Sequence, residues 1–510
     1  MAAPAPQYPQ GIRYLLAVAT LCLAIFLSAL DNTIIATATP YISDDFHSLK
    51  DVGWYSSVYT MAACTTQLLF GKLLTRYSIR WIYSFAMFLF LVGSAVCGSA
   101  PSSHALIIGR AIAGVGCAGI LVAAISLVAF LVPPAKRPVV LGLISASRGL
   151  ATTFGPLIGG ALTENVSWRW TFYINLPIGA ALQAAFLFLV HPPRRDTDAF
   201  TSWADFVKTL DLFGLAALLP SIVCLLLALQ WGGLHYAWQD ARIIVLLVLS
   251  GVLAIAFVSI EVWQGPAAML PTRVVTQRTV SSVSFYGFCT TSATFVLTYY
   301  LPTWFQGVKG ASPIQSGVWT LPWVITSTIV SVVGGVLISK VGYPGAFMGI
   351  GTVLGAIGSG LLTTFTLDTP ADKWIGYQII FAAGSSLCIL APLAVAQHAL
   401  PLKDIPIGTG MLMFTQAIGA SIFVAVAQAL FTNDLNNGLD KAGVSGVYSG
   451  TFMSGGISAL TDGLSGSSRN TILIVLNHAL TRSWQLAVVL CCISIIGVLT
   501  VEHSKMKEKE

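Results

Sequence analysis

Three charged side chains lie well inside long apolar stretches of the sequence, where a charge is costly and usually serves a function. They are Asp31, Arg110 and Arg148. Withdrawal from water disfavours the charged form of a carboxylate, whereas a nearby cation favours it. Because both effects can act on Asp31, we predict that it takes up and releases protons beside Arg110. The alternative is that Asp31 and Arg110 form an ion pair that only fixes helix packing.

The sequence holds no motif that predicts catalysis or a metal site. HExxH, GxSxG and GxxxxGK[ST] are absent, and the nine cysteines include no CxxC pair. The segment 114–119, GVGCAG, matches GxGxxG, but it lies inside an apolar stretch and follows no strand, so we interpret it as helix-packing glycine. We expect no enzymatic activity, no metal and no cofactor, with a proton as the coupling ion.

The composition is that of a membrane protein. Of the 510 residues, 55% are hydrophobic and 9% are charged, and the mean hydropathy is +0.80. A soluble domain carries about 25% charged residues. So few charges exclude a soluble enzyme, a disordered chain and a nucleic-acid-binding protein. We therefore predict an all-α polytopic membrane protein embedded in a lipid bilayer.

Fourteen apolar stretches are long enough to cross a bilayer, which takes about 20 residues per helix. With both termini placed in the cytoplasm, the cytoplasmic segments hold about twice as many Lys and Arg as the outer ones. This bias predicts cytoplasmic termini. We expect the plasma membrane, with a vacuolar or vesicle membrane as the alternative. The predicted spans are 14–36, 52–74, 81–100, 105–131, 139–161, 170–190, 212–230, 242–263, 282–305, 317–339, 345–366, 375–396, 407–431 and 485–501.

The spans fall into two sets of six with two spans inserted between them. Related patterns at 71–76 and 335–340 each follow the second span of a set, which indicates two pseudo-symmetric halves. Apolar residues in 472–480 repeat at helical spacing, so this stretch either lies on the membrane surface or packs on neighbouring spans. The predicted segments are a cytoplasmic tail 1–13, a first half 14–190, a cytoplasmic linker 191–211, inserted spans 212–263, a second half 282–501 with an outer segment 432–484, and a cytoplasmic tail 502–510.

Glycine and basic residues mark places where helices approach closely or change position. Gly155 and Gly159 share one face of the span 139–161, and Pro156 favours a kink there. Arg148 lies in the same span. It either binds an anionic group or stabilises one conformation of the protein; the alternative is that it only pairs with a backbone carbonyl or extends its charge to the membrane surface. The gating or conformational candidates are Gly71, Arg76, Arg80, Arg148, Gly155, Pro156, Gly159 and Gly160.

Aromatic and amide side chains within the spans are candidates for lining a substrate cavity. Apolar walls with a few polar groups suit amphiphilic small molecules, although aromatic residues also pack cores and mark membrane interfaces. Asn165 begins a glycosylation sequon so close to a span end that we expect it to be unmodified. The cavity candidates are Tyr59, Gln67, Tyr286, Tyr299, Trp304, Trp323 and Gln416.

Several motifs together resemble one known family. They are LDNTII at 30–35 with Pro40, the loop 71–80, Gly109-Arg110, the glycines of 155–160, WRWTFYINLPIG at 168–179 and YYLP at 299–302. The sequence resembles the major facilitator superfamily over nearly its whole length, in particular its fourteen-span drug:proton antiporter branch of fungal toxin and multidrug exporters. The loop departs from the usual pattern, with Thr75 where the family often has Asp and Ser78 where it often has Gly.

The resemblance implies a major facilitator fold and a transport function. The function would be proton-coupled export of amphiphilic small molecules, such as a toxin, a secondary metabolite or a drug, by alternating access. Asp31 and Arg110 would belong to the proton-coupling machinery. The glycines of 155–160 would shape the interface between the halves, and Arg76 would help to hold one access state. We expect a monomer; the alternatives are an amino-acid or siderophore transporter of the same fold and a non-transporting membrane receptor.

Overall fold

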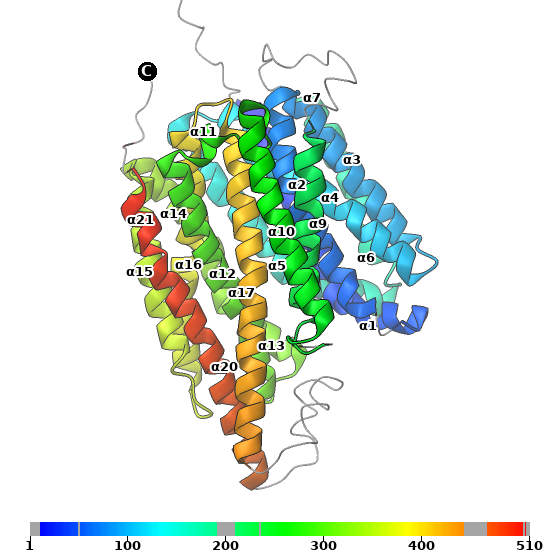
Figure 1. Cartoon of the computed structure of the whole chain (residues 1–510), viewed down its shortest axis with the longest axis vertical. Coiled ribbons are helices and arrows are strands. Elements are labelled where there is room, and N and C mark those ends of the chain that lie inside the picture. The colour runs from blue at the N-terminus through cyan, green and yellow to red at the C-terminus, as the bar shows by residue number, and fades with distance from the viewer. Residues whose placement is uncertain are drawn as a thin grey trace, which may run out of the picture.

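The computed structural model describes residues 11–48, 51–190, 210–233, 236–442, 467–502 and 505. These residues form long helices that lie side by side in an elongated bundle (Figure 1), and the described part of the chain contains no strand. The all-α prediction is confirmed. Four predicted segments fall partly outside the described residues: the tail 1–13, the linker 191–211, the outer segment 432–484 and the tail 502–510.

The helices follow the predicted order of two sets with an inserted pair. The first set is α1 (Gly11–Phe46), α2 (Val52–Arg76), α3 (Ile79–Gly98), α4 (Ser103–Leu131), α5 (Arg137–Asn165), α6 (Trp170–Tyr173) and α7 (Asn175–Leu189). The inserted pair is α9 (Leu212–Trp231) and α10 (Ala241–Gln264). The second set is α11 (Thr272–Val275), α12 (Arg278–Gly307), α13 (Pro313–Trp319), α14 (Leu321–Val341), α15 (Pro344–Leu362), α16 (Ala371–Ala399), α17 (Ile405–Lys441), α20 (Ser467–Ile493) and α21 (Ile495–Thr500).

Twelve helices of the described chain are long and apolar enough to cross a membrane. The α2 and α5 helices have 25 and 29 residues, which is sufficient length, but they are not among the twelve. Both carry charged and polar residues, among them Lys72 in α2 and Arg148 in α5. A multi-pass helical membrane fold is therefore established, while the count of fourteen spans stays a prediction.

The α4 helix forms the centre of the first half, because small residues let its neighbours approach. Of its apolar window, 89% is buried, against 17% for α10 at the periphery. A Cβ atom added at Gly114 would overlap the carbonyl of Tyr59 in α2, and one at Gly116 would overlap the backbone of Phe90 in α3. Because both positions admit only hydrogen, the segment 114–119 packs helices, as the sequence indicated.

The two halves meet at the end of the bundle where α2 ends and α5 begins, which we call the predicted cytoplasmic end (uppermost in Figure 1). Gly71 in α2 leaves room for the carbonyl of Pro406, which a Cβ atom there would approach to 3.0 Å. Gly335 in α14 leaves the same room for the carbonyl of Pro138. Each proline opens a helix, α17 and α5 respectively. The repeated glycine patterns therefore make equivalent contacts across the interface.

Hydrogen bonds reinforce this contact. Gln397 in α16 donates to Ile125 O in α4 at 2.8 Å, and Arg137 donates to Gln397 O at 3.4 Å. Ser339 in α14 donates to Ala135 O in the connection before α5. The structure is thus closed at the predicted cytoplasmic end.

Two helices extend further than predicted. The α1 helix continues ten residues past position 36 to Phe46, although Pro40 lies within it. The α20 helix begins at Ser467, well before the predicted span 485–501. In α20 the side chains of Ile472 and Leu476 are fully buried, because they pack with α12, α15 and α17. This stretch is therefore a helix packed on its neighbours rather than one lying on the membrane surface.

The glycines of α5 pack mainly within the first half, which differs from the role that the resemblance implied. A Cβ atom at Gly155 would overlap Thr33 of α1, and one at Gly159 would overlap Thr37. It is Gly142, one turn inside the start of α5, that packs against Ser331 of α14 in the other half. The interface between the halves is therefore shaped by the beginning of α5 and not by its 155–160 motif.

Candidate functional site

Asp31 and Arg110 form a buried ion pair in the first half. The Arg110 Nη1 and Asp31 Oδ2 atoms lie 2.6 Å apart, and neither side chain is exposed. They come from α1 and α4, which contact each other. The structure therefore brings together the two membrane-embedded residues that the sequence suggested as neighbours. Because α1 ends at Phe46 and not at the predicted position 36, Asp31 lies near the middle of its helix and not near the end of the predicted span 14–36.

A third polar residue, Asn175, completes the pair. Its Nδ2 atom donates to Asp31 Oδ1 at 2.7 Å and to Ser94 Oγ at 3.2 Å. Asn175 is the first residue of α7 and is fully buried. In the sequence, Asn175 contributes only to the motif that resembles the family and is not among the predicted site residues. An amide inside an apolar helix was the signal that could have found it.

Arg110 is held by groups on three sides. Its Nε atom donates to Tyr55 O at 2.9 Å, and its guanidinium lies 4.2 Å from the centre of the Tyr59 ring and 5.9 Å from that of Phe172. Its buried Nη2 atom has no hydrogen-bond partner. The N–H donors of this buried atom are therefore unused, which leaves room for a second arrangement of the charges.

This arrangement suits a carboxylate that changes its protonation state. Each Asp31 oxygen accepts from a different donor, so protonation of either oxygen weakens one of the two hydrogen bonds. Arg110 is already within 3.4 Å of the Asp31 carbonyl oxygen, and it also contacts Tyr55 O. The cation can thus keep backbone partners when the carboxylate becomes neutral.

The cavity candidates divide into packed and accessible side chains. Tyr286 donates to Met348 O at 2.8 Å and Trp304 donates to Asn477 Oδ1 at 2.7 Å, and both are fully buried. Trp323 packs on Phe381, whereas Tyr59 belongs to the Arg110 surroundings. Tyr299 is 57% exposed. Gln67 Oε1 and Gln416 Nε2 are buried without a hydrogen-bond partner, so these two amides are the candidates with free capacity to bind a solute.

The remaining gating candidates lie in different surroundings. Arg80 Nη2 donates to Leu187 O at 2.5 Å, which fixes the start of α3 to the end of α7. Arg76 and Arg148 are exposed. Pro156 is exposed, and Gly160 has no atom within 4 Å of where a Cβ would lie. Asn165 is exposed at the end of α5, and its use as a glycosylation site stays a prediction.

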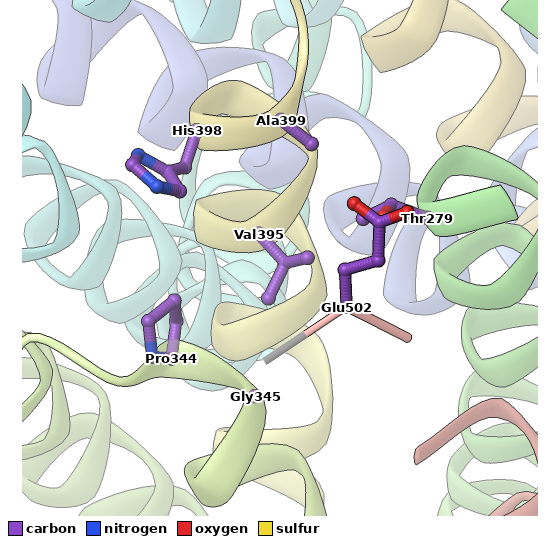
Figure 2. A pocket seen from close by; sticks show the side chains of 7 residues that line it. All are labelled: Thr279, Pro344, Gly345, Val395, His398, Ala399 and Glu502. Atoms are coloured by element: carbon purple, nitrogen blue, oxygen red, sulfur yellow. The ribbon is translucent and has the colours of Figure 1, made fainter. Parts of the chain in front are cut away.

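A cavity of about 240 Å³ opens at the predicted cytoplasmic end of the second half. Figure 2 shows its lining, in which Glu502 reaches toward Thr279 while His398 lies on the other side of α16. The cavity does not include Asp31 or the two unpartnered glutamines. Within the described residues no group of three or more His, Cys, Asp or Glu side chains could hold a metal.

Comparison with known proteins identifies the fold and the family. A family model described as Major Facilitator Superfamily matches residues 21–424. The chain belongs to the major facilitator superfamily. The MFS-type efflux pump MFS1 of Arthroderma benhamiae is 42% identical over 500 residues, covering 98% of this chain and 93% of that protein. The efflux pump aflT of Aspergillus parasiticus is 39% identical over 508 residues, covering 99% of each.

Solved structures of the superfamily share the fold. The proton:xylose symporter XylE, solved with 6-bromo-6-deoxy-D-glucose, superposes with a TM-score of 0.61 at 14% identity and covers 97% of both chains. The human organic anion transporter MFSD10 superposes with a TM-score of 0.59 over 94% of this chain. As a member of the major facilitator superfamily, this chain is a multi-pass membrane transporter of a small molecule and not an enzyme.

Proposed function

We propose that this protein exports amphiphilic small molecules, such as toxins or other secondary metabolites, in exchange for protons. The buried triad of Asp31, Arg110 and Asn175 is the observation that carries the proposal, because a titratable carboxylate shielded from water is a suitable proton carrier. The relatives that cover nearly the whole chain are named efflux pumps, which supports the outward direction.

The transport cycle follows from the closed end of the bundle. In this structure the contacts of Gly71 with Pro406 and of Gly335 with Pro138 close the predicted cytoplasmic end, so the binding region can open only to the other side. A proton arriving from outside neutralises Asp31 and favours release of the solute outward. Loss of that proton toward the cytoplasm, after the contacts at the predicted cytoplasmic end have opened, resets the carrier.

The proton gradient supplies enough free energy for this cycle. One pH unit is worth about 1.4 kcal/mol per proton. A membrane potential adds about 2.3 kcal/mol per elementary charge for each 100 mV. Because 1.4 kcal/mol corresponds to about a tenfold concentration ratio, one proton per solute supports at least tenfold accumulation.

The polar groups that are available inside the bundle indicate the substrate class. Gln67 and Gln416 are buried amides with an unpartnered atom each, and they come from α2 and α17 in opposite halves. Two neutral amides among apolar walls favour a largely apolar solute with a few hydrogen-bonding groups. Export from the cell requires a location in the plasma membrane, so we place the carrier there. We propose a monomer with cytoplasmic termini.

Transport by the full chain in lipid vesicles tests this function. Rhodamine 6G, a fluorescent amphiphile, serves as the first probe, followed by neutral and anionic dyes. We expect an imposed pH gradient to drive at least one dye against its concentration, and a proton uncoupler to abolish that movement. Gradient-driven movement of amino acids or siderophores but of no dye would favour the transporter alternatives, and no movement of any compound would favour a receptor.

A further inference from the structure

A second cluster of buried charges joins the inserted pair of helices to the rest of the bundle. Asp211 precedes the first residue of α9, Glu261 lies in the last turn of α10, and Lys72 projects from α2. Lys72 Nζ lies 3.8 Å from Asp211 Oδ2, with side-chain exposures of 7% and 0%. Glu261 falls near the end of the predicted span 242–263 and is not among the predicted site residues.

Asp211 is surrounded by donors, as a charged carboxylate requires. Its Oδ1 atom accepts from Gly214 N at 2.9 Å and from Gln264 Nε2 at 2.6 Å. Its Oδ2 atom accepts from Met269 N at 3.1 Å and faces Lys72. Three donors and one cation therefore contact the two oxygens of this side chain.

Glu261 has much weaker support for a negative charge. Its Oε2 atom accepts from Leu270 N at 2.6 Å, but its buried Oε1 atom has no hydrogen-bond donor. The side chain is only 5% exposed. A Cβ atom added at Gly214 would lie 2.8 Å from Asp211 Oδ2 and 2.9 Å from Glu261 Oε1, so both oxygens border one small space. Two carboxylates that face each other away from water are stable when one of them holds a proton.

Among the residues that the structure describes, the neighbouring charges leave no other partner for Glu261. Lys72 is already engaged, because its Nζ atom donates to Ala267 O at 2.7 Å and pairs with Asp211. Arg76, one turn further along α2, is exposed, and its charge interacts with that of Lys72. Asp404, at the start of the neighbouring α17, is paired with Arg273 at 2.5 Å.

We propose that Glu261 and Asp211 form a second proton-binding site, in which a proton on Glu261 Oε1 faces the Asp211 carboxylate. The site lies at the predicted cytoplasmic end, beside the α2 segment that contacts α17, and it is separate from Asp31. Loss of its proton would place two carboxylates beside Lys72 and draw the ammonium away from Ala267 O. The inserted pair would then change its contact with α2 as the pH on that side rises.

The test measures the proton directly, so it does not depend on transport or on the proposed export. Infrared spectra of the full chain in lipid nanodiscs are recorded across a pH series, and the C=O stretching band of protonated carboxyls is followed. We expect Glu261→Gln to remove one titrating component of this band. Asp31→Asn and the exposed Glu164→Gln serve as matched controls and keep that component. An unchanged band in Glu261→Gln would show that Glu261 carries no proton.

Two further variants test whether the band component belongs to Glu261, because they should shift the pH at which it disappears in opposite directions. Lys72→Met removes a cation that favours ionised Glu261, so the component should persist to a pH higher by about one unit. Asp211→Asn removes a neighbouring negative charge, so the band component should vanish at a pH lower by about one unit. Shifts in the opposite directions would overturn the proposal. So would a change of the wild-type band when choline replaces sodium, because a sodium ion would then fill the space.

Folding of the Glu261→Gln variant is checked by hydrogen exchange of the segment 265–270. The glutamine carbonyl can still accept from Leu270 N, and Asp211 still accepts from Met269 N, so we expect protection of these amides to be retained. With protection retained, a lost band component reports the proton rather than misfolding.

Discussion

At the scale of single residues, the Asp31 site couples a charge to the positions of three helices. Asp31, Arg110 and Asn175 belong to α1, α4 and α7, and each bond in the triad ties two of these helices together. Removing one partner of a buried ion pair costs about 3–5 kcal/mol, because the other charge is left without compensation. Protonation of Asp31 therefore has to be accompanied by a new partner for Arg110, and such a rearrangement can move helices.

Asn175→Ala tests the role of the third member of the triad. The amide donates to the charged form of Asp31, so its loss makes the ionised carboxylate less stable and the proton harder to release. We expect the pH profile of vesicle transport to move upward by roughly one pH unit. Asn165→Ala, at an exposed amide in α5, is the control and should leave the profile in place. If the pH profile of transport does not move in folded Asn175→Ala protein, Asn175 has only a structural role.

At the scale of helices, α5 uses its two ends for different purposes. Gly142 and the residues around Pro138 meet α14 of the other half, whereas Gly155 and Gly159 meet α1 of the same half. Because Asp31 belongs to α1, the second contact connects the proton site to the helix that closes the predicted cytoplasmic end. We infer that α1 and α5 move as one body during the cycle.

Gly155→Leu tests the contact between α1 and α5. A side chain there would overlap Thr33, and overpacking of this kind costs about 1–3 kcal/mol. We expect a lower thermal unfolding temperature and slower transport. Gly160→Leu is the matched control on the same helix, because nothing lies within 4 Å of its Cβ position. Equal effects of both variants would mean that helix propensity, and not the contact with α1, explains the loss.

At the scale of the whole molecule, the sequence was sufficient for the fold class and for the partners Asp31 and Arg110. Apolar runs and costly buried charges act locally, so they can be recognised without coordinates. The ends of α1 and α20 could not be predicted from hydropathy, because both extensions contain polar residues. Thr39 donates to Ile35 O within α1, and Asn477 in α20 donates to Phe365 O, which follows α15.

The remaining differences depend on which helices become neighbours. The packing of Gly155 and Gly159 against α1 could not be read from a motif that fits any close helix contact. Lys72, Asp211 and Glu261 are far apart in the sequence and meet only because α9 packs against α2 and α10 packs against α9 (Figure 1). Such charge clusters need a tertiary arrangement before they can be recognised.

The central claim, that Asp31 carries the coupling proton, is tested by comparing Asp31→Asn with the wild type in vesicles under a pH gradient. We predict that the variant loses at least tenfold in gradient-driven accumulation of a transported dye but still exchanges labelled for unlabelled dye when no gradient is applied. The exchange shows that the variant is folded and binds the solute. Full gradient-driven accumulation by Asp31→Asn would contradict the claim.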